Sequence, residues 1–436
     1  MIKRLLYKIY SKEQSYALKW SLIGQILIRI INIFSAIVFA RLLLPDEYGV
    51  YTYIIGSLVF IVNLVGLSIR TTSARNIAYK LQNNQLSFQR YFVVTLMIGN
   101  FLGVLGSVFT FFAIEKFEFN SITTIVNVNT LYLSSIAIWS ELSFGFLMGI
   151  LTGLKKFSVL NKLSIFSVLL KFTLSCLGYI FLDLNLAIIL WVMASIISTC
   201  FSYLILVRYK KTYFRLKEKY NLVNLKHEII DFFKLTIPIS FEALFLMSTY
   251  WLIQTIIINN INGGKQDLAI YNLAYQWKSI GLYLPAIVIN MLQPFFASNI
   301  GSGNSNETEK LFKNTHKMVV LISIAICLFL YGFSFFLPVI YGENYIETKG
   351  VLRILIISIV FVGLSNLIRE FFIAHGKVWV IAVTNFIVSI MVVTSFFLFK
   401  EYFSNPNAYA MAVVIGELIL FIVFALLYKR YGFKKR

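Results

Sequence analysis

The sequence predicts an all-α integral membrane protein with twelve transmembrane helices in two six-helix lobes. Hydrophobic residues make up 59% of the 436 residues, well above the roughly 45–50% found in soluble domains. Apolar runs of about 20 residues recur along the whole chain, and each is long enough to cross about 30 Å of hydrocarbon. A β-barrel would instead show alternating strands of about ten residues, so we expect helical spans.

The hydropathy pattern places the spans between short polar loops. In the first half we expect them at residues 18–40, 49–69, 90–114, 128–152, 163–182 and 186–207. In the second half we expect them at residues 235–258, 270–296, 317–340, 351–374, 378–399 and 409–428. The longest polar break, 208–234, predicts a cytoplasmic amphipathic linker between an N-terminal lobe, 1–207, and a C-terminal lobe, 235–436. A solvated linker is our preferred interpretation, and an anionic-lipid site there is the alternative.

The basic residues predict the orientation. With a cytoplasmic N-terminus, 29 of the 39 Lys and Arg lie in cytoplasmic segments and five in outer loops. Because positive loops are retained in the cytoplasm, both termini are expected there. The same rule explains the net charge of +20 without a nucleic-acid partner. The N-terminus has no cleavage site after a short apolar core, so we expect no removable signal peptide.

Enzyme chemistry, cofactors and metal sites are not expected. The three cysteines, Cys176, Cys200 and Cys327, lie inside apolar runs, where disulfides and zinc are disfavoured. No GxxxxGK[ST] loop for ATP is present. The short outer loops offer little room for the catalytic acids of a membrane-bound sugar polymerase.

Two local similarities indicate that the halves are repeats. The stretch "YGVYTYIIGS" resembles "LAIYNLAYQW", which aligns Tyr51 with Tyr271, and "GLKKF" resembles "HGKVW", which aligns Lys156 with Lys377. The offsets, 220 and 221 residues, are nearly equal. Both halves would start inside with six spans, so the repeats would be parallel. Such duplication is typical of transporters that handle substrate where the halves meet.

The first span carries a polar stripe on an otherwise apolar helix. Ser21, Gln25, Arg29 and Asn32 follow one another at spacings of four, four and three residues, which is one helix face. Arg29 lies about eleven residues into the span, too deep for easy escape to water. The stripe therefore predicts a face that meets water or a polar ligand. A buried Arg–carboxylate strut is the alternative.

The eighth span carries a second polar face, formed by Asn272, Gln276, Ser279 and Tyr283 and flanked by Tyr271, Tyr275 and Lys278. Aromatic rings beside amide and hydroxyl groups suit sugar rings, by stacking and by hydrogen bonding. The alternative is that the tyrosines are membrane-interface residues. Pro285 and Pro294 predict a bend in this span.

The remaining charges within spans have structural interpretations. We expect Glu141 to pair with Lys171, although Lys171 could instead add to a positive cavity. Arg353 is expected to reach the outer surface, and Glu417 to hydrogen-bond a neighbouring helix. Arg369 and Glu370 are expected to form a local pair, or Arg369 to reach the inner surface.

Glu242 lies just inside the seventh span after Pro238. Pairing with a basic residue is our first interpretation, and uptake and release of a coupling proton is the second.

The stretch "ARLLLPDEYGVY" at residues 40–51 resembles the first-loop motif of Wzx-type O-antigen and polysaccharide flippases, which share a superfamily with MATE drug exporters. "KLTIPIS", "LAIYNLAYQ" and "FFIAHGK" are further matches. Many relatives also carry an Asp-Arg pair late in span seven. This chain has "STYWLIQTIII" there, so any role of that pair does not carry over.

The resemblance implies a V-shaped, MATE-like bundle with a central cavity lined by spans one, two, seven and eight. It implies export of an undecaprenyl-pyrophosphate-linked oligosaccharide across the bacterial inner membrane, with H+ or Na+ as candidate coupling ions and polymerase machinery as a candidate partner. Arg29 and Lys278 against Glu242 would leave the lining with a net charge of +1, which favours anionic cargo. A MATE-like exporter of cations, with an acidic cavity, is the alternative, and a polysaccharide polymerase is a further one.

Overall fold

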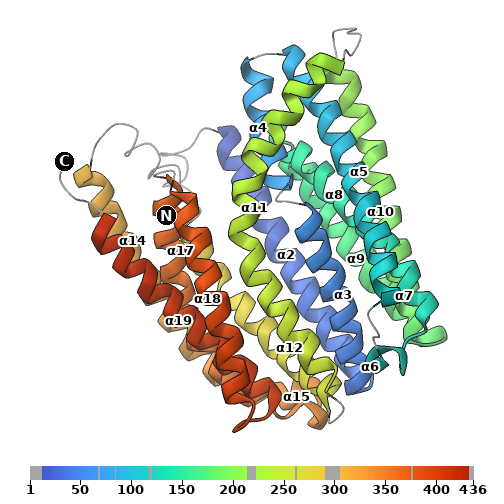
Figure 1. Ribbon diagram of the computed structural model, residues 1–436, viewed down its shortest axis with the longest axis vertical. Helices are drawn as coiled ribbons and strands as arrows, with labels where there is room; N and C mark the ends of the chain where they lie inside the picture. Colours follow the sequence, from blue (N-terminus) through green and yellow to red (C-terminus); the bar gives the residue numbers. More distant parts are fainter. Residues whose placement is uncertain are drawn as a thin grey trace. The chain divides into compact units, whose positions relative to one another are not determined.

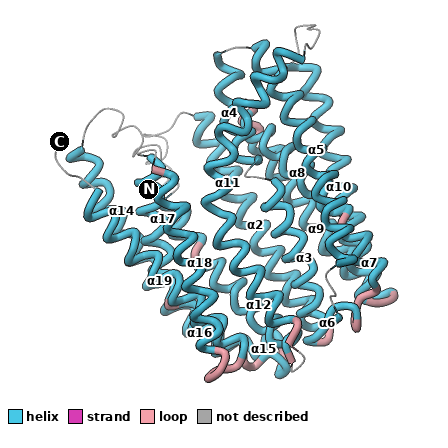
Figure 2. The backbone as a smooth tube through the Cα atoms, viewed as in Figure 1, coloured by secondary structure: helices cyan, strands magenta, loops and turns pink. Residues whose placement is uncertain are grey.

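The computed structural model describes residues 12–66, 69–83, 85–116, 120–213, 222–260, 263–289, 305–374 and 377–431. Within these ranges the regular structure is helical throughout, with loops confined to the turns between helices (Figure 2). The expected all-α membrane fold is therefore confirmed. The chain divides into two compact units, which are described separately: an N-terminal unit, Met1–Ala36 with Ile54–Ser240, and a C-terminal unit, Ile37–Tyr53 with Phe241–Arg436.

The N-terminal unit is built from ten helices or parts of helices in its described residues. It contains most of α2 (Lys12–Leu42), the second half of α3 (Pro45–Gly66), α4 (Ile69–Asn83), α5 (Gln85–Lys116), α6 (Asn120–Thr123), α7 (Val128–Ser134), α8 (Ile136–Gly153), α9 (Phe157–Phe181), α10 (Leu184–Tyr213) and the start of α11 (Leu222–Ile258). The helix α8 packs against α4, α5, α9 and α10, at the centre of the unit (Figure 1).

The core of the N-terminal unit forms around α8, most of whose residues are apolar and buried. Phe146, Leu147 and Ile150 are fully buried, together with Tyr91 of α5 and Phe232 of α11. A helix with so many apolar residues is stable when most of its surface is covered by other helices. Polar ties complete the packing: Lys80 of α4 pairs with Glu228 of α11.

The C-terminal unit begins with the end of α2 and the start of α3, then takes up α11 from Phe241. It continues with α12 (Gly264–Gly281), α14 (Ser305–Phe333), η1 (Ser334–Phe336), α15 (Leu337–Tyr341), η2 (Glu343–Tyr345), α16 (Thr348–Ile356), α17 (Ser358–Ala374), α18 (Val378–Phe399) and α19 (Asn405–Tyr431). A core of Val319, Leu367, Phe372, Ile381 and Phe424 joins α14, α17, α18 and α19.

The start of α3 follows from the "PDE" sequence after a two-residue connection. Pro45 occupies the first helical position, where its missing N–H is not needed. Asp46 and Glu47 place negative charge in the first turn, where the helix dipole favours it. The Glu47 carboxylate also accepts a hydrogen bond from the backbone N–H of Leu44, at 3.1 Å.

Nine described helices are long and apolar enough to cross a membrane, and the bent pair α16–α17 raises the number to ten. A shorter apolar segment, Leu244–Ile258, corresponds to the seventh expected span. The eighth is represented by α12 and by helical residues 283–289, and its expected end lies outside the described residues. Helix α12 ends at Gly281, one turn before Pro285, as a proline-induced break would require. The full set of twelve spans stays a prediction.

The division into units differs from the expected lobes in two places. Residues 37–53, from the first expected lobe, pack within the C-terminal unit, and the later boundary falls inside α11, between Ser240 and Phe241. The expected linker, 208–234, contributes the last turns of α10 and the first part of α11, and residues 214–221 lie outside the described ranges. The functional lobe boundaries stay a prediction.

Candidate functional site

The polar stripe of the first span lies on α2 in the N-terminal unit. Gln25 and Asn32 are exposed, and Arg29 is half-buried. Ile26 and Ile30, also on α2, are 46% and 54% exposed. The polar stripe therefore lies on an otherwise apolar helix surface. The described residues of the unit leave that surface partly exposed. The side chain of Ser21 lies outside the described ones.

The opposite side of α2 is fixed by close packing against α9. A Cβ added at Gly24 would lie 2.3 Å from Oδ1 of Asn161, so only glycine permits this approach. The ring of Phe34 meets that of Phe172 edge-on, with centroids 5.7 Å apart. These contacts hold the rotation of α2, and with it the direction in which Gln25, Arg29 and Asn32 project.

The charged pair expected in spans four and five is confirmed. The Lys171 ammonium of α9 donates to the Glu141 carboxylate of α8, which also accepts a hydrogen bond from Ser195 of α10. Lys171 lies 4.9 Å from the ring centroid of Trp191. Three helices are therefore joined at one carboxylate, and Lys171 is used structurally.

In the C-terminal unit, Lys278 of α12 is paired with Glu417 of α19. Its Nζ lies 2.8 and 2.6 Å from the two carboxylate oxygens, and the Lys278 side chain is completely buried. The expectation that Glu417 bonds a neighbouring helix is confirmed. Because this pair neutralises Lys278, the positive charge expected on the eighth span is balanced within the unit.

Three tyrosines extend the buried pair along α12 and α19. The rings of Tyr271 and Tyr409 stack with centroids 4.0 Å apart, and Tyr271 stacks on Tyr275 at 5.9 Å. The Tyr275 ring also lies 5.7 Å from Nζ of Lys278 and is 40% exposed. Of the tyrosines expected to meet a ligand, Tyr275 therefore presents an accessible ring, whereas Tyr271 is buried in packing.

The other polar face of α12 contacts the start of α3. Nδ2 of Asn272 donates to Oγ1 of Thr52 at 3.0 Å, and the hydroxyls of Tyr53 and Thr255 lie 2.8 Å apart. Thr52 and Asn272 are separated by 220 residues, the offset at which the sequence aligns the two halves. The contact therefore joins two positions that the sequence alignment of the halves treats as equivalent, and the duplication itself stays a prediction.

The approach of α3 to α12 needs a residue without a side chain. A Cβ added at Gly49 would lie 1.9 Å from the carbonyl oxygen of Lys265. Close by, Arg41 at the end of α2 donates to the backbone carbonyls of Val339 and Ile340 at the end of α15. Those carbonyls lack helical partners, and a guanidinium is a suitable cap for them.

The other predicted residues are placed as follows. Gln276 and Tyr283 are half-buried, and Tyr283 lies just beyond the break that ends α12. Glu242 lies on α11, and its side chain is outside the described ones.

The local pair of Arg369 with Glu370 is confirmed at 2.8 Å. Arg353 donates to Ser334 at 3.0 Å and lies over the rings of Tyr331 and Phe335.

A carboxylate at the beginning of α12 has a shifted pKa. Burial raises the pKa of Asp267 above its ordinary value, Glu347 raises it further, and a hydrogen bond from Asn405 opposes the shift. That bond, from Nδ2 of Asn405 to Oδ2 of Asp267, measures 2.7 Å and joins α12 to the start of α19.

Within the described residues, no cluster of three or more His, Cys, Asp or Glu could hold a metal ion.

Comparison with protein families decides the classification. A family model described as polysaccharide biosynthesis protein matches residues 18–300, well over half of the chain. The chain belongs to the polysaccharide biosynthesis protein family. A second model, described as MatE, matches residues 238–399.

Two curated members of polysaccharide pathways are similar in sequence. The capsular polysaccharide biosynthesis protein CapF of Staphylococcus aureus is 24% identical over 431 residues, covering 94% of this chain and 97% of the relative. The EPS I polysaccharide export inner membrane protein EpsE of Ralstonia nicotianae is 26% identical over 121 residues, 27% of each chain.

Solved structures of MATE transporters show the same fold. An inward-facing multidrug resistance MATE transporter of the MOP superfamily has a TM-score of 0.76 at 16% identity, with 92% of this chain and 94% of that chain covered. A MOP superfamily transporter from Pyrococcus furiosus, titled as having a binding pocket of reversed polarity, has a TM-score of 0.69 at 16% identity and 96% coverage of both chains. This member of the polysaccharide biosynthesis protein family thus has the fold of MATE transporters.

Sequence reasoning missed three polar contacts of the C-terminal unit. Arg41 is one of the five basic residues that the sequence places in outer loops, and its guanidinium caps α15. Sequence reasoning treated Lys278 and Glu417 separately, although both were identified as buried charges. For Thr52 and Asn272, the separation of 220 residues, equal to the offset of the two local similarities, was an available signal.

Proposed function

We propose that this protein is a flippase for an undecaprenyl-pyrophosphate-linked oligosaccharide, such as an O-antigen or capsule repeat unit. It moves the headgroup from the cytoplasmic to the periplasmic or outer leaflet of the bacterial cytoplasmic membrane by alternating access, with both of its termini in the cytoplasm. Membership of the polysaccharide biosynthesis protein family supports this assignment, as do the names of CapF and EpsE.

The observation that favours anionic over cationic cargo is the pairing of the acids. Of the four acids expected within the membrane, Glu141, Glu370 and Glu417 each bond a basic residue of their own unit. A carboxylate neutralised in this way offers little attraction to a cation. Helix α2 carries the Arg29 guanidinium between two exposed amides, and the neighbouring Ile26 and Ile30 are exposed as well. The MATE-like exporter of cations is therefore the second candidate.

Arg29 is assigned to the pyrophosphate. A guanidinium stays charged in any surroundings and donates two parallel hydrogen bonds to phosphate oxygens. Gln25 and Asn32, one turn away on either side, supply neutral donors and acceptors for the adjoining sugar. In the C-terminal unit, Tyr275 is the candidate for stacking on a sugar ring, since it is 40% exposed, and Asn272, Gln276 and Tyr283 are candidate polar contacts.

We also propose that Glu242 carries the coupling proton, because it lies near the inner end of the seventh span, shortly after Pro238. If Glu242 carries the proton, Glu242→Gln should abolish the dependence of transport on a pH gradient and leave ligand binding intact. Transport that keeps its gradient dependence in Glu242→Gln would show that this residue is structural. Transport measured under a sodium gradient, without a pH gradient, distinguishes Na+ from H+ as the coupling ion. Co-purification with the polymerase tests whether that enzyme is a partner.

A binding experiment distinguishes the two kinds of cargo. We expect undecaprenyl pyrophosphate to raise the melting temperature of the purified protein, and Arg29→Ala to remove most of that increase. One charge-assisted hydrogen bond contributes about 1.5–3 kcal/mol, which corresponds to roughly a 10- to 150-fold loss of affinity. Stabilisation by a lipophilic cation, with none by the pyrophosphate lipid, would favour the MATE-like function instead.

A further inference from the structure

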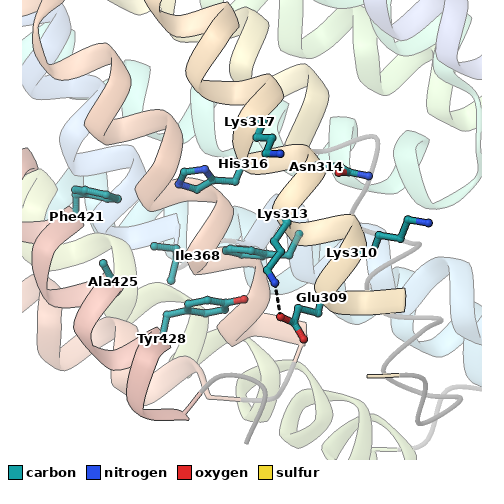
Figure 3. Close-up of a pocket in the computed structure, with 11 residues that line it drawn as sticks. Glu309, Lys310, Lys313, Asn314, His316, Lys317, Ile368, Phe421, Ala425 and Tyr428 are labelled. Atoms are coloured by element: carbon teal, nitrogen blue, oxygen red, sulfur yellow. Dashed lines mark ion pairs between the residues drawn. The ribbon is translucent and has the colours of Figure 1, made fainter. Parts of the chain in front are cut away.

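A pocket of about 760 Å³ opens between the start of α14, α17 and the end of α19 in the C-terminal unit. It is remote in sequence from the polar faces of α2 and α12, and the proposed transport function does not use it. Figure 3 shows Lys313 reaching toward Glu309 close to the Tyr428 ring, and Lys310 and Lys317 projecting from the same two turns of α14. We call this the α14–α19 pocket.

The rim of the α14–α19 pocket has an excess of positive charge. Lys310, Lys313 and Lys317 line it, against Glu309 as the one acid among its described lining residues. Glu309 pairs with Lys313 at 2.7 Å, while Lys310 and Lys317 form no ion pair with any described residue. Two lysine charges are therefore left to attract an anion.

The wall of the pocket is apolar and extends along α19. Phe421, Ala425 and Tyr428 follow at spacings of four and three residues, which places them on one helix face. At 1.5 Å per residue, that face runs for roughly 10 Å. The Tyr428 ring is anchored by stacking on Phe312, with centroids 4.4 Å apart. A ligand that fits both parts has an anionic end and an apolar body.

The rim lies at the end of the membrane-spanning region. The apolar span of α14 begins at Glu309, and that of α19 ends at Arg430. In the orientation proposed above, this end faces the cytoplasmic leaflet. Basic pockets between helix ends on that side suit the headgroups of anionic lipids. The volume falls within the roughly 300–1,000 Å³ of small-ligand pockets, which is too small for a lipid-linked chain of several sugars.

We propose that the α14–α19 pocket binds an anionic phospholipid, with its phosphate at Lys310, Lys313 and Lys317 and an acyl chain against Phe421 and Ala425. The exposed residues Leu321 and Leu328, 69% and 70% accessible on α14, continue the apolar path into the bilayer. The lipid occupies this site as a bound component of the protein and is not transported.

Native mass spectrometry of the full chain in detergent tests the proposal. Phosphatidylglycerol should be retained in preference to phosphatidylcholine with the same acyl chains. Lys310→Gln/Lys313→Gln/Lys317→Gln should lower that retention by roughly tenfold or more, since each basic group near an anionic surface contributes several-fold. The matched control, Lys155→Gln/Lys162→Gln/Lys226→Gln, removes three exposed lysines of the N-terminal unit and should retain the lipid. Equal losses of phosphatidylglycerol retention in both triple variants would show that only the net charge of the protein matters. That result would contradict the proposed lipid site.

A second pair of variants tests the apolar wall without changing charge. Ala425→Phe fills the pocket and should reduce phosphatidylglycerol retention, whereas Leu426→Phe, at a neighbouring position that is 62% exposed, should not. A third experiment titrates inorganic phosphate into lipid-free protein, to distinguish a phosphate site from a lipid site. Phosphate binding that depends on the three lysines, together with unchanged lipid retention in Ala425→Phe, would identify a phosphate site and contradict the lipid proposal. Both readouts are independent of transport.

Discussion

Nζ of Lys278 lies 2.6 Å from a carboxylate oxygen of Glu417, although 139 residues separate them in the chain. The ammonium is fully buried, so its charge is compensated by this carboxylate and by the nearby Tyr275 ring. A charged pair of this kind contributes little net stability compared with an apolar pair, but breaking it leaves one charge buried without a partner. It therefore fixes how α12 packs against α19.

Removal of one partner should destabilise the protein strongly. Glu417→Gln should lower the free energy of unfolding by about 3–5 kcal/mol, the usual effect of leaving a buried charge uncompensated. The control is Glu309→Gln, which breaks the exposed Glu309–Lys313 pair and should change stability by about 1 kcal/mol or less. Melting temperatures in detergent compare the two. A Glu417→Gln protein as stable as Glu309→Gln would mean that Lys278 is not a buried charge.

The contact between Thr52 and Asn272 should be broken during transport. Helix α3 is continuous, yet its first half belongs to the C-terminal unit and its second half to the N-terminal unit. We expect transport to loosen one of these two attachments. On the C-terminal side the attachment includes the hydrogen bonds of Asn272 with Thr52 and of Tyr53 with Thr255, and each such bond contributes only about 0.5–1.5 kcal/mol.

A reversible crosslink tests this expectation. Thr52→Cys/Asn272→Cys, in a background without Cys176, Cys200 and Cys327, should stop transport after oxidation and regain it after reduction. Each single cysteine variant serves as the control and should be insensitive to oxidant. Full transport by the oxidised double variant would show that α3 and α12 stay together throughout the cycle.

The shifted pKa of Asp267 predicts a pH dependence of stability. Since burial raises its pKa in the folded state, the native protein binds the proton more tightly, and stability falls as pH rises from about 4, the ordinary value. Asp267→Asn removes the fall of stability with rising pH, because the amide does not ionise. The amide also keeps an oxygen that accepts the hydrogen bond from Asn405. The variant should therefore match or exceed the wild type at pH 7 and lose its advantage below about pH 4.

Asp183 should give the opposite pH dependence of stability in the same measurement. Burial acts to raise the pKa of Asp183, but hydrogen bonds from Asn185 and Leu186 together lower it below its ordinary value. Its stabilisation is present above the ordinary pKa and lost as pH falls, so Asp183→Asn should be the less stable protein at pH 7. Identical pH profiles for Asp267→Asn and Asp183→Asn would contradict both assignments.

Thiol labelling tests the orientation. In a cysteine-free background, Asn344→Cys should react with an impermeant reagent applied to intact spheroplasts, and Lys226→Cys should react only after lysis. Both positions are exposed, so differences in accessibility within the protein do not explain the contrast. Labelling of Lys226→Cys in intact cells would reverse the orientation and move the α14–α19 pocket to the outer leaflet.

The sequence was sufficient for the membrane fold because apolar length and loop charge are local properties. It also predicted the Glu141–Lys171 pair, since spans four and five are consecutive and place the two charges at similar depth. It did not predict the Lys278–Glu417 pair, because depth along a helix does not say which distant helices are neighbours. The Gln25–Arg29–Asn32 stripe was predicted from spacing, whereas the burial of Tyr271 and the exposure of Tyr275 depend on α19 and required the structure.

The central claim is that Arg29 binds the pyrophosphate of a lipid-linked oligosaccharide during its transfer between leaflets. The most direct measurement is flipping of a defined undecaprenyl-pyrophosphate-linked sugar in proteoliposomes, with wild type, Arg29→Lys and Arg29→Ala at equal reconstituted amounts. We predict transfer by the wild type, partial transfer by Arg29→Lys, which keeps the charge but loses the fork, and none above protein-free liposomes for a folded Arg29→Ala. Transfer by Arg29→Ala at the wild-type rate would contradict the claim.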